Sequence, residues 1–325
     1  MAEESPRKEI SQPVEVQTAK VKVIEETKAT EVKAQELKDA GINVQTGVQE
    51  IKTVPTAPPF RIVPSSSKKR THLNMMLYGK FGVGKTLLAC SAQDVPEMQN
   101  VIYIEADGGD KVLRRRGDID EIEFVRDYNK IGRIFEFLRK HCYYRDKNDT
   151  ENLIRLESTF RGEKVKEPKI YNTVVIDTLN EIQTYCMNQI LGINTDNWKL
   201  DAEPIVPAGE DWGTDLTMIR WLVRSFRDLP MHTIFICAED TFLDKAKQIH
   251  IQPALPGKLA SAVQGFLDNV GYYHQFIGEN NTIHRRLYFT PGSNYPAKNR
   301  WEGWNGTSIL DPTMKTIYEI EKQYG

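Results

Sequence analysis

Apolar residues fall into short continuous runs from residue 73 onward, and amphipathic stretches separate these runs. Such runs are typical of parallel strands that are covered on both faces. We expect strands at Leu73–Tyr78, Val101–Ala106, Ile122–Val125, Thr173–Ile176 and Thr233–Ala238. We expect helices between them, at Lys85–Ala92, Tyr128–His141, Leu179–Leu191 and Thr214–Arg227. This alternation predicts an α/β domain with a mainly parallel central sheet.

Two polar segments interrupt this pattern, and the C-terminal part replaces it. Tyr143–Lys169 is charged and Gly192–Asp211 is rich in Asn, Asp and Pro, so we expect both to be surface insertions. Near the end, Gly271–Ile277 and Arg285–Thr290 flank the turn residues Gly278-Glu-Asn-Asn281, which predicts a C-terminal hairpin. A short final helix is expected after Asp311, with Pro312 in its first turn.

The N-terminal part has a different composition. No Phe, Trp or Tyr precedes Phe60, and Glu, Lys, Thr, Val and Gln dominate. Such a segment buries too little apolar surface to offset its ordering entropy. We therefore predict that residues 1–70 are a disordered tail and linker and that residues 71–325 form the folded domain. In the alternative interpretation, Phe60 and Ile62 dock on a neighbouring subunit.

Overall composition excludes several classes of protein. The 43 basic residues nearly balance the 45 acidic ones, which argues against a protein held on nucleic acid by net charge. The four cysteines are scattered, so reduced thiols are expected and a structural zinc site is not. No apolar run is long enough for a transmembrane helix, and the start lacks the apolar core of a signal peptide. We expect a cytoplasmic protein without a membrane partner.

The strongest motif is a phosphate-binding loop between the first strand and the first helix. Gly79-Lys80-Phe81-Gly82-Val83-Gly84-Lys85-Thr86 fits the pattern G-x-x-x-x-G-K-[ST] at every fixed position. Glycines allow a tight turn whose backbone N–H groups converge on phosphate oxygens, and the helix that follows presents its positive end. Lys85 is expected to reach the β- and γ-phosphates of ATP, and the Thr86 hydroxyl to bind Mg²⁺.

Acidic residues follow other apolar runs. Val174-Val-Ile-Asp177 ends in a carboxylate that can support the Mg²⁺ beside Thr86. The second strand ends Tyr103-Ile-Glu-Ala-Asp107, with Asp107 as our first choice for orienting the attacking water and Glu105 as our second choice. We expect strand alternation to put these two on one face, although both acids could simply solvate the strand end. Glu239, followed by Asp240, lies where a sensor of the γ-phosphate is expected.

These features together resemble the RecA-like branch of phosphate-loop ATPases. More narrowly, the chain looks like the phage-encoded RecA-like proteins described as nucleotide-binding or Sak-type single-strand annealing proteins. The similarity runs from about Leu73 to Asp311 and includes GKFGVGKT, VVIDTLNE, Asp211-Trp-Gly213 and Pro253-Ala-Leu-Pro-Gly-Lys258. One departure is Asp107, which stands where RecA-like recombinases usually carry Glu and is one methylene shorter.

The segment Lys298-Asn-Arg300-Trp301-Glu-Gly303 resembles the Lys-Asn-Arg-Phe-Gly motif of RadA and DnaB-type helicases. In those relatives the Lys and Arg reach the γ-phosphate of the neighbouring subunit. The resemblance implies that Lys298 and Arg300 act in trans and that the active unit is a homo-oligomeric ring or filament. The alternative is an exposed basic turn.

The resemblance also implies where DNA binds. The loop after the fifth strand, Thr241–Lys258, corresponds to a loop that faces DNA in RecA-like proteins. Its candidate contacts for sequence-independent binding of single-stranded DNA are Phe242, Lys245, Lys247, His250 and Lys258. A second basic candidate is Lys111–Arg116, and an ordinary solvated loop is the alternative.

The leading hypothesis is therefore an ATPase that uses Mg²⁺ and is stimulated by single-stranded DNA, in phage recombination, annealing or replication. In that case it would work in the host cytoplasm, with a single-strand-binding or replication protein as a candidate partner. One rival is a nucleotide switch or helicase-loader-like scaffold that does not hydrolyse ATP. The other is a small-molecule kinase.

Overall fold

The computed structural model describes residues 72–108, 113–122, 126–194 and 203–325. The chain divides into two compact units, Met1–Ser67 and Lys68–Gly325, and all described residues belong to the second. The tail and linker predicted at residues 1–70, with Phe60 and Ile62, lie outside the described residues.

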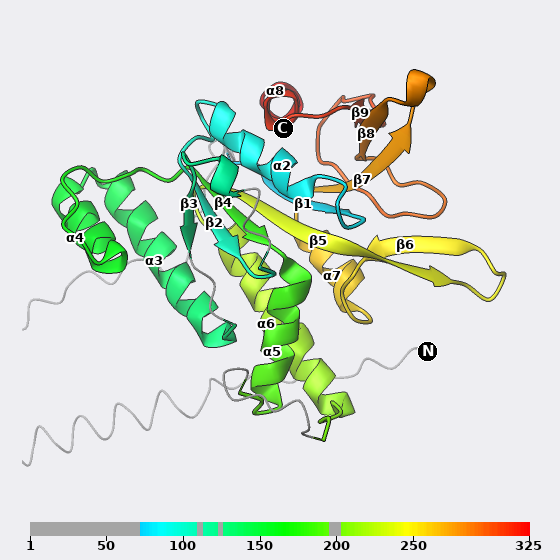
Figure 1. Cartoon of the computed structure of the whole chain (residues 1–325), viewed down its shortest axis with the longest axis horizontal. Coiled ribbons are helices and arrows are strands. Elements are labelled where there is room, and N and C mark those ends of the chain that lie inside the picture. Colours follow the sequence, from blue (N-terminus) through cyan, green and yellow to red (C-terminus); the bar gives the residue numbers. More distant parts are fainter. Residues whose placement is uncertain (1–71, 109–112, 123–125, 195–202) are drawn as a thin grey trace, which may run out of the picture. The chain divides into compact units, whose positions relative to one another are not determined.

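A mixed sheet runs through the described unit (Figure 1). Its strands are β1 (Asn74–Gly79), β2 (Val101–Glu105), β3 (Asp120–Ile122), β4 (Thr173–Asp177), β5 (His232–Leu243), β6 (Ile249–Pro253), β7 (Asn269–Ile277), β8 (Ile283–Tyr288) and β9 (Ser308–Leu310). Their order is β3-β2-β4-β5-β1-β7-β8-β9, and β6 pairs with the far half of β5. In this sheet order, neighbouring strands are parallel from β3 through β2, β4, β5 and β1 to β7. Strands β8 and β9 add antiparallel pairs.

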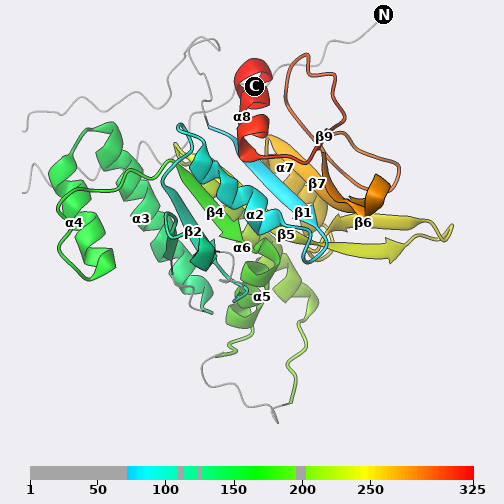
Figure 2. The same ribbon diagram turned by 45° about the horizontal axis from the view of Figure 1, so that its top comes forward.

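Helices cover both faces of this sheet (Figure 2). They are α2 (Lys85–Cys90), α3 (Tyr128–Asp146), α4 (Thr150–Arg161), α5 (Leu179–Ile190), α6 (Gly209–Arg227), α7 (Leu259–Phe266) and α8 (Met314–Tyr324). Helices α3, α5, α6 and α7 pack on one face, and α2 and α8 pack on the other. Helix α4 lies against α3.

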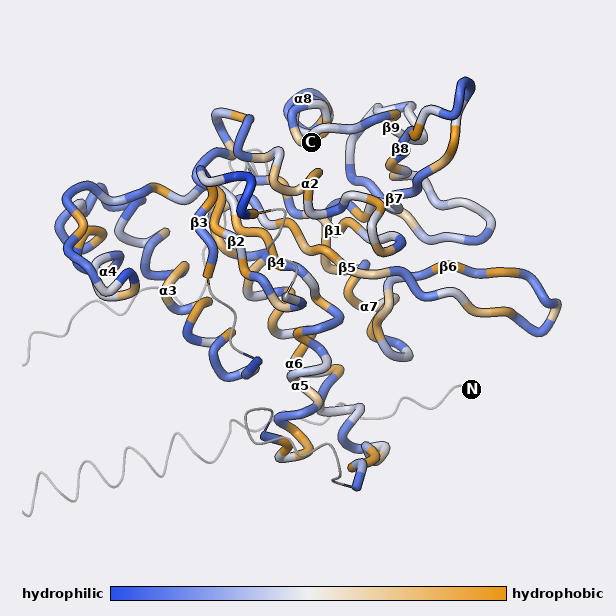
Figure 3. The backbone as a smooth tube through the Cα atoms, viewed as in Figure 1, coloured by the Kyte–Doolittle hydropathy of each residue, from blue (hydrophilic) through white to orange (hydrophobic). Residues whose placement is uncertain are grey.

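The continuous apolar runs follow from this three-layer arrangement. In β1, Met76 and Tyr78 pack under the α3–α7 layer, whereas Met75 and Leu77 pack under α2 and α8. Neither set is exposed. Figure 3 shows the central strands as the apolar part of the unit. A strand that is buried on both faces needs apolar side chains at every position, which confirms the sequence prediction of a mainly parallel α/β sheet.

Local boundaries differ from the prediction where caps and turns decide them. The charged segment Tyr143–Lys169, expected as a surface insertion, is largely helical, because α3 continues to Asp146 and Asp149 caps α4 by accepting from the Asn152 backbone N–H at 3.1 Å. The C-terminal hairpin forms as predicted. Pro312, however, precedes helix α8, whose N-cap is Thr313.

Two expected strands also differ in extent. The strand predicted at Ile122–Val125 lies at Asp120–Ile122, and residues 123–125 are outside the described part. The fifth strand does not stop at Ala238 but continues to Leu243 and forms a hairpin with β6. Asp244 stabilises its turn by accepting from the backbone N–H groups of Ala246 and Gln248, both at 2.8 Å. The expected loop at Thr241–Lys258 is therefore mostly a β-hairpin.

Within the described residues, no helix has the length and apolar character needed to cross a membrane.

A buried histidine makes this fold sensitive to acid. His232 is 3 % exposed at the start of β5, where its Nδ1 accepts the Leu73 backbone N–H at 2.9 Å. Burial, reinforced by His72, lowers the pKa of His232 to about 3. The unfolded chain takes up this proton below about pH 6.5, so folding releases it between the two pKa values. Stability therefore falls as the pH drops through that window.

We expect this group to lower the free energy of unfolding by about 2 kcal/mol between pH 7 and pH 5. Denaturant unfolding at the two pH values measures the change. In His232→Asn the amide oxygen can still accept from Leu73, but no proton is taken up, so the drop should be smaller by that amount. Equal drops in the two proteins would show that His232 does not set the acid sensitivity.

Candidate active site

The phosphate loop joins the carboxyl end of β1 to the start of α2. Gly79 lies so close to β7 that a Cβ there would be 2.1 Å from the Tyr273 carbonyl oxygen. Gly84, the N-cap of α2, has a φ of 100°, which L side chains rarely adopt. The chain can therefore follow this path only with glycine at both positions. A cavity of about 230 Å³ opens beside the loop, lined by Lys80–Val83 and Tyr273–Gln275.

Lys85 is held inside the loop. Its Nζ donates to the carbonyl oxygens of Gly79 at 2.8 Å and Lys80 at 2.9 Å. Burial lowers the pKa of Lys85, and the negative charge of Asp177 opposes this shift. No carboxylate forms an ion pair with Lys85 among the described residues. A buried ammonium without an ion-pair partner fits an anionic ligand such as a phosphate. Lys80, Phe81 and Gly82 are exposed, and Val83 is buried beneath the loop.

Asp177 and Thr86 lie together as predicted. The Thr86 hydroxyl donates to Asp177 Oδ2 at 2.7 Å, and the same oxygen accepts the hydroxyl of Tyr103 on β2. Asp177 is buried at the end of β4, and burial raises the pKa of this carboxyl while the Tyr103 and Thr86 hydrogen bonds lower it. These oxygen atoms are ligands of the type that a hard divalent cation prefers. No sequence motif indicated Tyr103, which reads as an ordinary residue of an apolar strand.

The two acids near the end of β2 do different things. Glu105 is buried, and its Oε1 accepts the Asp107 backbone N–H at 3.0 Å, which supports the turn after the strand. Asp107 is exposed just beyond the strand, so the predicted alternation on one face does not hold. The charge of Asp107 nevertheless adds to burial in raising the pKa of Asp177 and of Glu181. Asp107 therefore affects the site through its negative charge, whereas Glu105 supports the backbone turn after β2.

The start of α5 contributes residues that the prediction missed. Thr178 caps the helix and accepts the Glu181 backbone N–H at 3.4 Å. The side-chain oxygen of Asn180 accepts the Ala238 backbone N–H at 3.0 Å, which ties α5 to the end of β5. Both Asn180 and Glu181 stand in the quoted VVIDTLNE motif, so their position directly after Asp177 was the available signal.

Glu239 lies one residue beyond Ala238, which pairs with Gly79 at the end of β1. Its Oε2 atom is buried without a hydrogen-bond partner in the described part of the chain. The charge of Glu239 contributes, after burial, to the raised pKa values of Tyr78 and Tyr272. Glu239 is thus a partly buried acid next to the phosphate-loop strand, whereas Asp240 is exposed.

Lys298 and Arg300 are not part of the same chain's phosphate site. Lys298 pairs by its backbone with Val270 near the amino end of β7, whereas the phosphate loop is at the carboxyl end of the neighbouring β1. The Lys298 ammonium donates to the Leu267 carbonyl oxygen at 2.8 Å, at the end of α7. The Arg300 side chain is 53 % exposed and forms an ion pair with Asp268 at 2.8 Å.

The candidate DNA contacts gather on the arm formed by the β5–β6 hairpin. The rings of Phe242 and His250 stack across the two strands, with centroids 5.4 Å apart, and His250 Nε2 lies 3.0 Å from Asp244 Oδ2. Lys245 and Lys247 stand in the turn. Lys258 is separate from them, at the N-cap of α7.

The second basic candidate, Lys111–Arg116, is described only in part. Lys111 and the residue after it lie outside the described residues. Arg116 forms ion pairs with Asp94 at 2.8 Å and Asp118 at 3.1 Å. The charge of Arg116 is therefore already engaged within the chain, whereas Arg114 and Arg115 of the same segment are exposed.

A family comparison identifies the domain. The model of the AAA domain family matches residues 71–301, more than half of the chain. The chain belongs to the AAA domain family. It is therefore a phosphate-loop ATPase domain that binds nucleotide, and the α/β, RecA-like fold expected from the sequence is confirmed.

Other comparisons are more distant. No curated protein sequence matches this AAA domain chain. Among solved structures, it is similar to the RadB recombinase (12 % identity, TM-score 0.29, covering 74 % of this chain and 85 % of that one). It is also similar to the pCW3 conjugation coupling protein TcpA in its monomer form with ATPγS (15 % identity, TM-score 0.32, covering 64 % of this chain and 50 % of that one). The chain thus spans half the length of TcpA.

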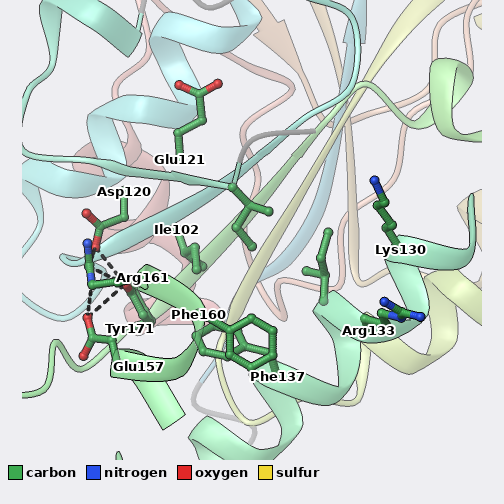
Figure 4. A pocket seen from close by; sticks show the side chains of 12 residues that line it. Ile102, Asp120, Glu121, Lys130, Arg133, Phe137, Glu157, Phe160, Arg161 and Tyr171 are labelled. Carbon is green, nitrogen blue, oxygen red and sulfur yellow. Dashed lines mark hydrogen bonds and ion pairs between the residues drawn. The ribbon is translucent and has the colours of Figure 1, made fainter. Parts of the chain in front are cut away.

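A second hollow, of about 450 Å³, lies at the other end of the sheet between β3, α3 and α4 (Figure 4). Its acids are already engaged, because Arg161 contacts Glu157 at 2.8 Å and Asp120 at 2.6 Å, and the Tyr171 hydroxyl also donates to Asp120. With β2, β4 and β5 between β3 and β1, this hollow is separate from the phosphate site of the AAA domain.

Tyr103→Phe tests whether the hydroxyl on Asp177 shapes the cation site. A hydrogen bond to a charged group contributes about 1.5–3 kcal/mol. We expect the Mg²⁺ concentration for half-maximal binding of a fluorescent ADP to rise roughly tenfold. Tyr128→Phe removes the hydroxyl of a partly buried tyrosine, which donates to the Met218 carbonyl oxygen at 3.2 Å, and is the control. An unchanged Mg²⁺ midpoint in a folded Tyr103→Phe protein would contradict this role.

Proposed function

We propose that this AAA domain is a RecA-like, Mg²⁺-dependent ATPase that acts on single-stranded DNA in phage recombination, annealing or replication. The observation that carries the proposal is the joined site of Lys85, Thr86 and Asp177 at the carboxyl ends of β1 and β4. Backbone N–H groups of residues 79–86 would bind the phosphates of ATP, and Lys85 would exchange its carbonyl partners for phosphate oxygens.

The same site supports Mg²⁺ and hydrolysis. The Thr86 hydroxyl and the Asp177 carboxylate would hold the cation, which neutralises charge on the phosphates when bound. Asp107 is the preferred group for orienting water, because its charge reaches Asp177 while Glu105 is engaged with the backbone. Glu239, whose Oε2 atom is buried without a hydrogen-bond partner in the described residues, is positioned to respond to the γ-phosphate from the neighbouring strand.

The position of Arg300 favours completion of each site by a second copy. Arg300 lies toward the amino end of β7, away from the phosphate loop of its own chain, and is half exposed. It would therefore act in trans within a ring or filament. Lys298 would first have to leave the carbonyl oxygens at the end of α7, and Arg300 its ion pair with Asp268, but Arg300 is the more exposed of the two and is therefore the better candidate.

The β5–β6 arm supports contact with single-stranded DNA. Its turn carries Lys245 and Lys247, and Phe242 is 44 % exposed beside His250. Lysines that meet phosphates and an aromatic ring that stacks on bases are sufficient for sequence-independent binding.

A single-strand-binding or replication protein in the host cytoplasm remains part of this proposal. A switch or loader scaffold is the alternative if the assembled protein binds ATP without turnover, and a kinase if phosphate is found on an acceptor.

Hydrolysis of ATP, titrated with single-stranded, double-stranded and no DNA, tests the function. We expect single-stranded DNA to raise turnover several-fold and Lys85→Ala to abolish turnover, since the variant lacks the ammonium that faces the phosphates. Turnover that is identical under all three conditions at low salt would refute the DNA-dependent part.

The double variant Lys245→Gln/Lys247→Gln tests the arm. Each lost phosphate contact should reduce the slope of log affinity against log salt for single-stranded DNA by about 0.7, or about 1.4 for the pair. Lys140→Gln/Lys147→Gln, two exposed lysines at the end of α3, is the charge-matched control. Equal slopes for the two double variants would exclude the arm from the DNA interface.

Mixing variants tests action in trans. Arg300→Ala alone should bind ATP but hydrolyse it at least tenfold more slowly, since an arginine that stabilises transition-state charge contributes about 10³-fold or more. Mixed with Lys85→Ala, it should recover part of the activity, because some interfaces then combine an intact loop with an intact Arg300. Full activity of a monomer, shown by mass measurement, would exclude this arrangement.

A further inference from the structure

Arg285 reaches the phosphate loop from the C-terminal hairpin of the same chain. Its Nε donates to the carbonyl oxygen of Val83 at 2.8 Å. A Cβ added to Gly84 would be 3.3 Å from this Nε. The guanidinium therefore lies against the peptide unit that joins residues 83 and 84, in the space that any larger residue at position 84 would need. Nothing in the phosphate-loop motif indicates this arginine, which is 199 residues away from Thr86 along the sequence (285 − 86).

The backbone of Arg285 is fixed independently of the loop. It pairs with Gln275 of β7 across the hairpin. Asp311, just after β9, accepts the Arg285 N–H on its Oδ1 at 2.8 Å and returns its own N–H to the Arg285 carbonyl oxygen at 2.7 Å. This two-point clamp leaves the guanidinium for the loop. No other hydrogen bond or ion pair of that guanidinium is found in the described part of the chain.

The chemistry of the contacted peptide gives this contact a consequence for ligand binding. The peptide unit that carries the Val83 carbonyl also carries the Gly84 N–H, one of the loop donors that face a phosphate. A cationic donor on the carbonyl polarises the peptide, which strengthens the N–H as a donor. The guanidinium also places a positive charge beside the loop, and within the described residues no carboxylate at ion-pair distance neutralises it.

We propose that Arg285 is a positioning residue that acts in cis: it fixes the phosphate loop and strengthens the binding of the polyphosphate of a nucleoside di- or triphosphate. Asp311 supports it. The inference rests on the proposed binding of ATP by this loop. It adds a connection from the C-terminal strands β8 and β9 to nucleotide affinity.

Titration of Mg²⁺ and a fluorescent ADP into the full-length protein tests the proposal. Arg285→Gln should raise the Kd for ADP about tenfold, with little change in the Kd of the control Arg286→Gln. The control is well matched because Arg286 is adjacent on β8 and points to the opposite face, with its guanidinium 5.1 Å from the Phe276 ring. Arg285→Lys keeps the charge and should recover part of the affinity.

The outcomes separate the two proposals. If the wild-type protein fails to bind ADP, the nucleotide function itself is refuted. If the wild-type protein binds and Arg285→Gln binds equally well, only the role of Arg285 is refuted. Should Arg285→Gln fail to fold, Asp311→Ala removes the side-chain half of the clamp but keeps the arginine. It should raise the Kd for ADP about threefold, and an unchanged Kd would overturn the proposal.

Discussion

The site depends on one buried carboxylate. Asp177 is taken out of water at the end of β4, where an unsatisfied charge would cost several kcal/mol. Its Oδ2 accepts hydroxyl groups from Thr86 on α2 and Tyr103 on β2, so three elements meet at one oxygen. The strand order requires α2 to reach across β5, since β5 separates β1 from β4, and α2 contacts all three strands. The hydrogen bond from Thr86 thus joins the phosphate loop to the strand that carries the acid.

Strand β5 runs from the phosphate site to the arm formed by the β5–β6 hairpin. Its first half is buried between β1 and β4, and beyond it Ala238 donates its backbone N–H to Asn180 and Glu239 follows. The same strand then leaves the sheet and becomes the arm with Phe242. A change at the phosphate site would therefore reach the arm through a continuous backbone. Arg300, by contrast, lies toward the amino end of the neighbouring strand β7, away from the phosphate loop of its own chain.

Local sequence was sufficient for the loop and for the central strands. Lys85 and Thr86 are specified by a contiguous motif, and Asp177 by an apolar run that ends in an acid, so their positions could be predicted. Tyr103 and Arg285 could not, because each reaches the site only through tertiary packing, from another strand in one case and from the C-terminal hairpin in the other.

Errors in the sequence interpretation came from the ends of strands. Glu105 and Asp107 are two residues apart, but β2 ends at Glu105, so the period-two rule stops before Asp107. The resemblance to RecA-like proteins suggested a loop at Thr241–Lys258, and the alternation in Ile249–Pro253 that forms β6 was missed. In both cases a turn, rather than the apolar pattern, decides where the side chains lie.

The central claim is that the Lys85–Thr86–Asp177 site binds the phosphates of ATP together with Mg²⁺. A crystal structure of the protein with Mg²⁺ and a slowly hydrolysed ATP analogue tests it most directly. We predict that Lys85 Nζ leaves the carbonyl oxygens of Gly79 and Lys80 and contacts phosphate oxygens, while the Thr86 hydroxyl contacts the cation beside Asp177. Nucleotide bound elsewhere, with Lys85 still on those two carbonyl oxygens, would contradict it.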